Sequence, residues 1–239
     1  PLSSSNISAV QLTRATSIAF FFAAALSFNA YYVITIGSGL SLYSGLFHVS
    51  AVSMAREFFV FLVGGLILLP WASSVNTGNL TGDTVRPSIP EYPLILIFTT
   101  IGASFLVSST DLVSLYLSIE LQSFAVYILA TIYRNSEAST SAGLKYFLLG
   151  ALSSALILLG SRVIYSYTGL TQLDAISNLM SVDSSTGLTN TSMGVYLGLL
   201  IMTIGFLFKV GAAPFHNWAP DVYRSEERRV GKECPRCVD

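Results

Sequence analysis

The stretch GFLFKVGAAPFHNWAPDVY, residues 205–223, begins as an apolar helix of the kind that crosses a membrane. Lys209 lies at the end of the apolar part, and the helix-breaking residues Gly211 and Pro214 follow it. A charged side chain inside a membrane span costs about 2.5–3.5 kcal/mol on insertion scales, so such a residue marks a functional site by default. The stretch therefore predicts a membrane span with a functional lysine, which needs a partner elsewhere in the chain.

The composition is that of an integral membrane protein. Of the 239 residues, 52% are hydrophobic and only 10% are charged, whereas a soluble domain has about 25% charged residues. Residues 15–55 contain no Asp, Glu, Lys or Arg at all. The net charge of −1 lacks the basic footprint that nucleic-acid binding requires, so we expect no nucleic-acid partner.

Six apolar segments approach or exceed the length of about 20 residues that a membrane-spanning helix requires. They cover residues 17–36, 54–72, 92–109, 111–133, 141–166 and 193–213. Small residues recur within them, which favours close packing of helices, and the alternating polarity of a membrane β-barrel is missing from the sequence. The predicted fold is an all-α polytopic transmembrane helical bundle of about six spans.

The segments between the spans are predicted to be irregular. Residues 37–52 are weakly amphipathic and are expected at the membrane interface, where we interpret His48 as an interfacial or packed histidine. Residues 73–91 are rich in Ser, Asn, Thr, Gly and Pro and predict an exposed loop. A polar loop of roughly 25 residues, longer than most connections in compact domains, is expected between the last two spans.

Three ionisable residues lie within the later spans, namely Glu120, Lys145 and Lys209. Glu120 follows Asp111 by nine residues, which places it roughly 13 Å from the start of its helix and close to the middle of the bilayer. Residues 1–223 contain only these two lysines, and both are in apolar spans. Glu120 is the only acidic residue deep enough to pair with either lysine.

Two interpretations of these residues remain open. A buried Glu–Lys pair couples two protonation states, and chains of ionisable residues in spans are typical of proton relays. The alternative is a static buried ion pair with Ser or Thr partners. Ionisable residues in three spans favour the relay, so Glu120, Lys145 and Lys209 are the predicted relay residues.

The end of the last span also has two interpretations. Pro214 lacks an amide hydrogen and Gly211 lowers helix propensity, so a break there leaves backbone carbonyls beside a hydrated cavity, as in ion transporters. Alternatively, the span ends at residue 213, and His216 and Asp221, which are secondary candidates for the site, lie at the interface. Spacing alone does not decide between the two, and we predict a broken helix.

The sequence shows no metal or cofactor site. It contains neither a GxGxxG motif before a helix nor a GKS or GKT phosphate-binding loop, and potential metal ligands do not cluster. Cys234 and Cys237 form a CxxC motif without a second ligand pair. We therefore expect no metal-binding and no cofactor-binding residues in this chain.

Three blocks of the chain resemble the antiporter-like membrane subunits of NADH:ubiquinone oxidoreductase, respiratory complex I, in its mitochondrially encoded form. They are SSTDLVSLYLSIELQSFAVYILA (108–130), LKYFLLGALSSALILLGSRVIYSYTGLTQLD (144–174) and GFLFKVGAAPFHNWAPDVY (205–223). The resemblance extends over most of residues 15–223, and the last block is highly specific for these subunits. Glu120 followed by Leu-Gln-Ser looks like the chain 2 group of the family.

The resemblance implies a proton-translocating, multi-pass subunit of the NADH:ubiquinone reductase in the mitochondrial inner membrane. It implies that Glu120, Lys145 and Lys209 are the glutamate of the fifth helix and the lysines of the sixth and broken seventh helices, in a proton half-channel. NADH, flavin, iron–sulfur clusters and ubiquinone are then handled by or with other subunits. The implied partners are other membrane-arm subunits and the lipid bilayer.

The C-terminal residues depart from the family. Residues 224–239, RSEERRVGKECPRCVD, are dense in charge and do not resemble the family's next helices. We expect residues 1–223 to form an antiporter-like membrane domain, the N-terminal half-channel portion, and residues 224–239 to be an artefactual tail. Because the chain begins with Pro1, we also expect a fragment. Alternatives to the complex I function are a subunit of a multi-subunit cation/proton antiporter and a non-functional fragment.

Overall fold

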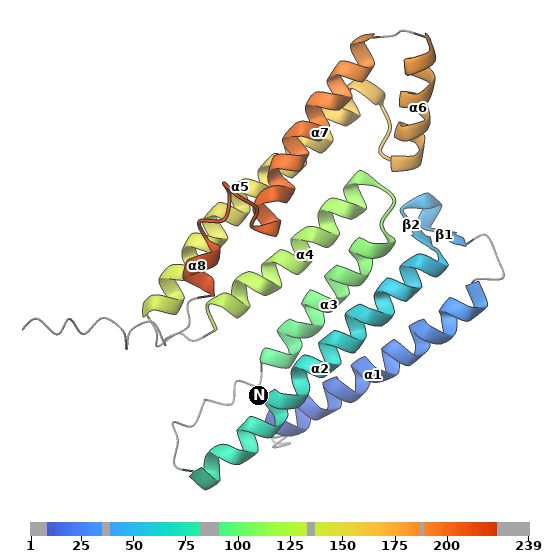
Figure 1. Cartoon of the computed structure of the whole chain (residues 1–239). Coiled ribbons are helices and arrows are strands. Elements are labelled where there is room, and N and C mark those ends of the chain that lie inside the picture. Colours follow the sequence, from blue (N-terminus) through green and yellow to red (C-terminus); the bar gives the residue numbers. More distant parts are fainter. Residues whose placement is uncertain (1–8, 35–38, 82–90, 133–136, 187–188, 224–239) are drawn as a thin grey trace, which may run out of the picture.

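The computed structural model describes residues 9–34, 39–81, 91–132, 137–186 and 189–223. Within these ranges the chain forms long helices, one short hairpin and one 3₁₀ turn (Figure 1). In chain order the elements are α1 (Ala9–Ile34), β1 (Leu40–Leu42), η1 (Tyr43–Gly45), β2 (Phe47–Val49), α2 (Ala51–Thr81), α3 (Tyr92–Ser108), α4 (Leu112–Ala130), α5 (Glu137–Thr168), α6 (Leu173–Thr186), α7 (Thr189–Val210) and α8 (Ala219–Val222).

Six of the helices are the predicted spans. Helices α1, α2, α4, α5 and α7 are long and apolar enough to cross a membrane, and α3 is a shorter apolar helix of 17 residues. Large apolar side chains such as Phe22 and Leu200 are 66% and 59% exposed, as expected for surfaces that face lipid. The prediction of a helical bundle with about six spans is confirmed.

The helices pack mainly in three pairs, α1 with α2, α3 with α4, and α5 with α7, which α2–α3 and α4–α5 contacts join into one array (Figure 1). The α5–α7 interface is built on small residues. A Cβ added to Gly160 would lie 2.7 Å from the Gly198 carbonyl oxygen, and one added to Gly205 would lie 2.9 Å from the Ser153 carbonyl oxygen. The two backbones therefore approach as closely as glycine permits, which fixes α7 against α5.

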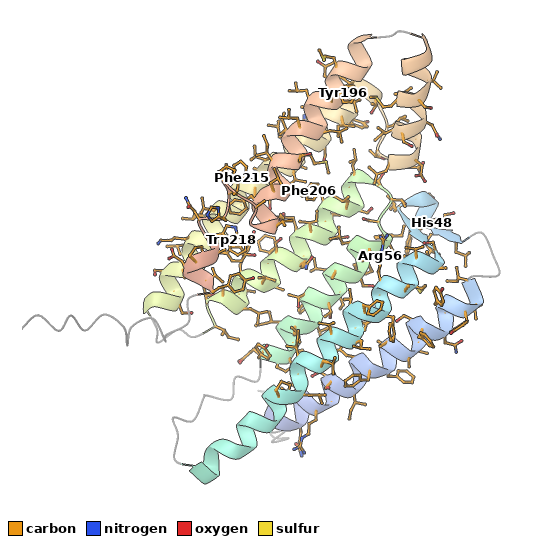
Figure 2. The ribbon with its side chains drawn as sticks, in the orientation of Figure 1. His48, Arg56, Tyr196, Phe206, Phe215 and Trp218 are labelled. Carbon is orange, nitrogen blue, oxygen red and sulfur yellow. The ribbon has the colours of Figure 1, made fainter. Side chains whose placement is uncertain are left out.

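The predicted interfacial segment 37–52 contains an antiparallel hairpin, in which Ser41 pairs with His48. This short sheet is an addition to the predicted all-α fold. The turn is held by Thr110, whose hydroxyl donates to the Gly45 carbonyl at 2.8 Å and whose amide donates to the Leu46 carbonyl at 3.1 Å. Figure 2 shows His48 within the hairpin, at the opposite end of the bundle from Trp218.

Two predicted loops are partly helical. Helix α2 continues through Thr81, into the predicted loop 73–91, because polar residues alone do not end a helix. Helix α6 occupies part of the predicted loop between the last spans. Its apolar residues Leu173, Ile176 and Met180 recur at helical spacing, and Ile176 and Met180 pack in the core that includes Val195 of α7. The loop predictions were therefore wrong for these residues.

Candidate functional site

Helix α4 carries Glu120 into the bundle. The helix begins at a cap in which Asp111 Oδ2 accepts a hydrogen bond from the Val113 amide at 2.9 Å, and Asp111 is 2% exposed. Glu120 follows nine residues later, which corresponds to about 13 Å along the helix axis. The cap therefore supports the predicted mid-bundle position of Glu120.

Helix α7 brings Lys209 to the same place in its last turn. The Lys209 ammonium donates a hydrogen bond to Ser123 Oγ at 2.7 Å, and its Nζ lies 3.9 Å from Glu120 Oε1. The side chains of Lys209 and Glu120 are only 18% and 16% exposed. The structure thus joins the two residues that the sequence predicted as partners, although 88 positions separate them in the chain.

The polar atoms around this pair differ in their hydrogen bonding. Ser123 Oγ also donates to the Ile119 carbonyl at 2.7 Å, so the hydroxyl connects the lysine to the α4 backbone. Glu120 Oε1 is buried and has no hydrogen-bond partner among the described residues. A buried carboxylate with incomplete hydrogen bonding is costly in a static structure and favourable for a group that gains and loses a proton.

The helical backbone is interrupted just after Lys209. Helix α7 ends at Val210, Gly211 adopts a φ of +71°, and the short helix α8 begins only at Ala219. Gly211 suits this left-handed backbone because it has no Cβ. Helix α7 therefore ends three residues before residue 213, the predicted end of the last span. A second short helix, α8, follows after the interruption.

Trp218 stabilises the break. Its Nε1 donates to the Phe208 carbonyl at 3.1 Å, and its ring stacks on Tyr146 of α5 with centroids 4.5 Å apart. Trp218 is 7% exposed. Figure 2 shows Phe215 and Trp218 in the segment that follows α7 and lies against α5. Trp218 is therefore a buried packing residue that holds this segment against α5.

Lys145 belongs to a different pair. Its Nζ donates to Asp221 Oδ2 of α8 at 2.8 Å, and the two side chains are 63% and 36% exposed. This contact joins the beginning of α5 to the segment after the break. His216 and Pro214 are exposed in that segment. The structure thus separates the predicted relay residues into a buried pair and an exposed lysine.

Sequence reasoning named Ser or Thr partners for the pair without identifying them. Ser123 lies three residues after Glu120, a spacing that places both on one face of a helix. Tyr127, which is 6% exposed, continues the same face and contacts the Tyr146 ring with centroids 4.8 Å apart. The helical spacing from Glu120 is the signal that identifies both residues.

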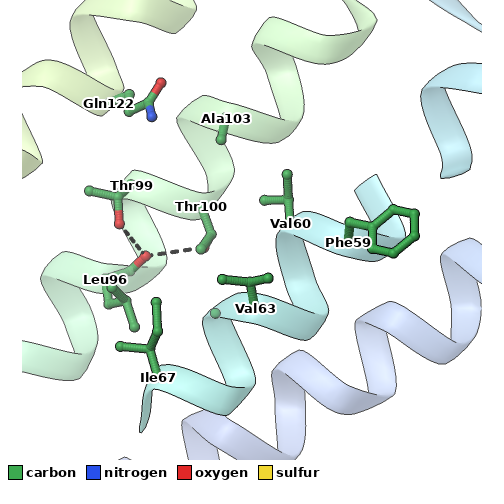
Figure 3. Close-up of a pocket in the computed structure, with 10 residues that line it drawn as sticks. Phe59, Val60, Val63, Ile67, Leu96, Thr99, Thr100, Ala103 and Gln122 are labelled. Carbon is green, nitrogen blue, oxygen red and sulfur yellow. Dashed lines mark hydrogen bonds between the residues drawn. The ribbon is translucent and has the colours of Figure 1, made fainter. Parts of the chain in front are cut away.

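A separate apolar groove of about 410 Å³ lies between α2 and α3 (Figure 3). Its walls include Val63 and Ile67 of α2 and Thr100 of α3, and Gln122 of α4 also contributes. Neither Glu120 nor Lys209 lines it. In the part of the chain that the structure describes, no three His, Cys, Asp or Glu residues come together as a metal site.

Comparison with known families identifies this arrangement. Residues 109–227 match the family described as NADH:quinone oxidoreductase/Mrp antiporter, TM. The chain belongs to this family of antiporter-like membrane subunits. It is similar to NADH-ubiquinone oxidoreductase chain 2 of Rhizopus oryzae, with 49% identity over 232 residues that cover 93% of this chain and 43% of the relative. The resemblance to the chain 2 group is confirmed.

A second relative is also a chain 2 protein, and a solved structure shares the fold. NADH-ubiquinone oxidoreductase chain 2 of Arabidopsis thaliana is 39% identical over 175 residues, which cover 73% of this chain and 35% of that protein. Among solved structures, respiratory complex I from Thermus thermophilus contains a chain with a TM-score of 0.68 and 27% identity, over 90% of this chain and 42% of that one. The chain therefore spans less than half the length of the relatives that it matches.

The fold extends to more distant proteins. A chain of the Mrp complex from Dietzia sp. DQ12-45-1b matches with a TM-score of 0.62 and 17% identity, over 89% of this chain and 38% of that one. A likeness at this identity concerns the fold alone. The bundle of this chain is thus a multi-pass membrane fold that different membrane complexes use.

Proposed function

We propose that this chain is part of a proton-translocating membrane-arm subunit of respiratory complex I, coupled to electron transfer from NADH to ubiquinone in the mitochondrial inner membrane. The observation that carries this proposal is the buried Glu120–Lys209 contact at 3.9 Å, beside the end of α7. The similarity to NADH-ubiquinone oxidoreductase chain 2 proteins supports the choice of complex.

In the proposed mechanism, Glu120 and Lys209 exchange and hold protons as a coupled pair. Each side chain changes the proton affinity of the other because the two charges interact in surroundings with little water. Lys145 acts as the next relay position at the exposed end of α5, where Asp221 holds it. Gly211 and Pro214 provide the break that places this end of α7 near polar groups and solvent.

The proposal assigns electron transfer to other subunits. We expect this chain to bind no NADH, flavin, iron–sulfur cluster or metal, and ubiquinone to react at a site formed with other subunits. Its partners are the other membrane-arm subunits and the lipid bilayer. Residues 1–223 would form the antiporter-like domain of the protein; residues 224–239 lie outside the described residues, and the tail assignment stays a prediction.

A second candidate is a subunit of a cation/proton antiporter without a redox partner. The matching family includes Mrp antiporters, and the Mrp complex chain shares the fold. Purification of the full-length subunit from its native membrane separates the two candidates. Co-purification with NADH dehydrogenase activity supports complex I, and purification without that activity contradicts it.

The relay itself is tested by Glu120→Gln in the full-length subunit within the assembled complex. The amide keeps the shape of the side chain but cannot carry the proton, so we expect a severe loss of proton pumping and of coupled quinone reduction. Asp174→Asn, at an exposed position in the first turn of α6, is the matched carboxylate control and should retain both activities. Normal turnover and proton yield in Glu120→Gln would contradict the proposed function.

A further inference from the structure

The Ser123 hydroxyl occupies a central position beside the buried pair. It accepts the hydrogen bond from Lys209 at 2.7 Å and donates its own hydrogen to the Ile119 carbonyl at 2.7 Å. Because its proton is used in the bond to Ile119, the hydroxyl presents a lone pair to the ammonium. Ser123 thus ties the lysine head group to the backbone of α4.

This tie explains the length of the Lys209–Glu120 contact. Direct hydrogen bonds between an ammonium and a carboxylate are about 2.7–2.9 Å long. The observed distance of 3.9 Å is longer, and Glu120 Oε1 has no hydrogen-bond partner among the described residues. The lysine therefore bonds to the serine hydroxyl and stops short of the carboxylate, although the carboxylate is the stronger acceptor.

We propose that Ser123 is a positioning residue that keeps the Lys209 ammonium near Glu120 but out of direct hydrogen-bond contact. The inference rests on the proposed relay function and names a residue that controls it. At 3.9 Å the charges still influence each other, yet the pair separates without breaking a direct ionic hydrogen bond. A small movement of the lysine side chain is then enough to change its partner.

The proposal has a measurable consequence when the hydroxyl is removed. In Ser123→Ala, Glu120 becomes the strong acceptor within reach of Lys209, and the ammonium closes on the carboxylate. Shortening the distance from 3.9 Å to about 2.8 Å, at an effective dielectric constant of about 20, strengthens the attraction enough to slow separation roughly tenfold. The expected result is a roughly tenfold lower rate of proton pumping.

Ser118 provides a matched control on the same helix. Its hydroxyl donates to the Ser114 carbonyl at 2.7 Å, the same bond to the carbonyl four residues earlier that Ser123 makes. Ser118 is also buried, at 3% exposure. Ser118→Ala therefore removes the same local hydrogen bond without altering the contact to Lys209.

The experiment compares variants of the full-length subunit in the complex, reconstituted in lipid vesicles. Proton uptake on NADH addition gives the pumping rate, and infrared difference spectra report the Glu120 carboxylate band, which Glu120→Gln identifies by its loss. Ser123→Ala should lower the rate and shift the band. Ser123→Thr, which keeps a hydroxyl able to bond the same carbonyl, should retain most of the rate and the band position. Ser118→Ala should change neither.

The outcomes separate this inference from the proposed function. An unchanged band and rate in Ser123→Ala, or an equal loss in Ser118→Ala, overturns the positioning role. If Glu120→Gln abolishes pumping in the same series, the relay stands while the inference fails. If Glu120→Gln has no effect either, the proposed function fails. Ser123→Val is isosteric with Ser123→Thr, so a difference between these two variants tests the hydroxyl even where Ser123→Ala does not assemble.

Discussion

Lys145 and Lys209 each contact a carboxylate, but in opposite surroundings. The Lys145–Asp221 pair is short, at 2.8 Å, and its side chains are 63% and 36% exposed. The Lys209–Glu120 pair is longer, at 3.9 Å, and its side chains are 18% and 16% exposed. Distance alone would rank the first pair as the stronger interaction.

Burial reverses that order. Water and salt screen an exposed pair, so such contacts contribute about 0–1 kcal/mol. Inside a bundle the same charges interact more strongly, and the loss of one partner leaves the other without compensation. The comparison teaches that the longer, buried contact is the more sensitive to loss of one partner, while the shorter, exposed one joins α5 to the segment after the break.

The largest expected effect comes from breaking the buried pair on one side. Lys209→Ala leaves the Glu120 charge in the bundle, which should lower the free energy of unfolding by about 3–5 kcal/mol. Denaturant unfolding of the subunit in lipid–detergent micelles measures this loss. The double variant Lys209→Ala/Glu120→Gln removes both charges and should recover most of it. A double variant as unstable as the single one would contradict the argument.

The close approach of α5 and α7 supports the buried pair and should be the next most sensitive feature. Gly160→Ala places a methyl group 2.7 Å from the Gly198 carbonyl oxygen and 2.8 Å from the Met202 amide nitrogen, so the two backbones must separate. The expected cost is about 1–3 kcal/mol, with a parallel loss of pumping. The same unfolding measurement tests it.

Gly65→Ala is the control for this prediction. The three atoms nearest to the added methyl group all belong to the ring of Phe21 of α1, at 3.2 to 3.3 Å, and that side chain is 37% exposed and can shift. Alanine also has the higher helix propensity. We expect little change in stability, and equal costs for Gly160→Ala and Gly65→Ala would show that backbone contact is not the cause.

Trp218→Phe isolates one hydrogen bond at the break. Phenylalanine keeps an aromatic ring against Tyr146 but cannot donate to the Phe208 carbonyl, which still accepts from the Gly211 amide at 3.0 Å. The expected loss is therefore about 1 kcal/mol. Trp218→Leu, which removes the stacking as well, should cost more. Equal stability of the tryptophan and phenylalanine proteins would refute the role of the indole nitrogen.

The smallest effect is expected at the exposed pair. Removing the charge in Lys145→Met should change the free energy of unfolding by less than about 1 kcal/mol. A double-mutant cycle with Asp221→Asn measures the coupling, which should decrease further as salt is raised. A coupling energy as large as that of Lys209 and Glu120 would remove the contrast between the two pairs.

The spans and the buried pair were predictable because each depends on strong local signals. Apolar runs identify the helices, and Glu120 was the only acidic residue deep enough to meet a lysine of the spans. The Lys145–Asp221 contact was not predictable, because it depends on how the chain turns after Gly211 and returns to α5. Sequence spacing gives no direction for that turn.

Helix α6 and the hairpin were not predicted, for a different reason. In α6, polar residues surround Leu173, Ile176 and Met180, so composition indicated a loop while the helical spacing of the three apolar residues indicated a helix. The hairpin strands have only three residues each, too few for a pattern. The turn between them is held by Thr110, which lies far away in the sequence.

The glycine contacts between α5 and α7 also restrict what can move. With Gly160 and Gly198 in backbone contact, α7 cannot slide or rotate against α5 without separating the helices. The backbone at Lys209 is therefore a fixed support. A movement that changes the contact between Lys209 and Glu120 must therefore come from the lysine side chain or from α4, which carries Glu120.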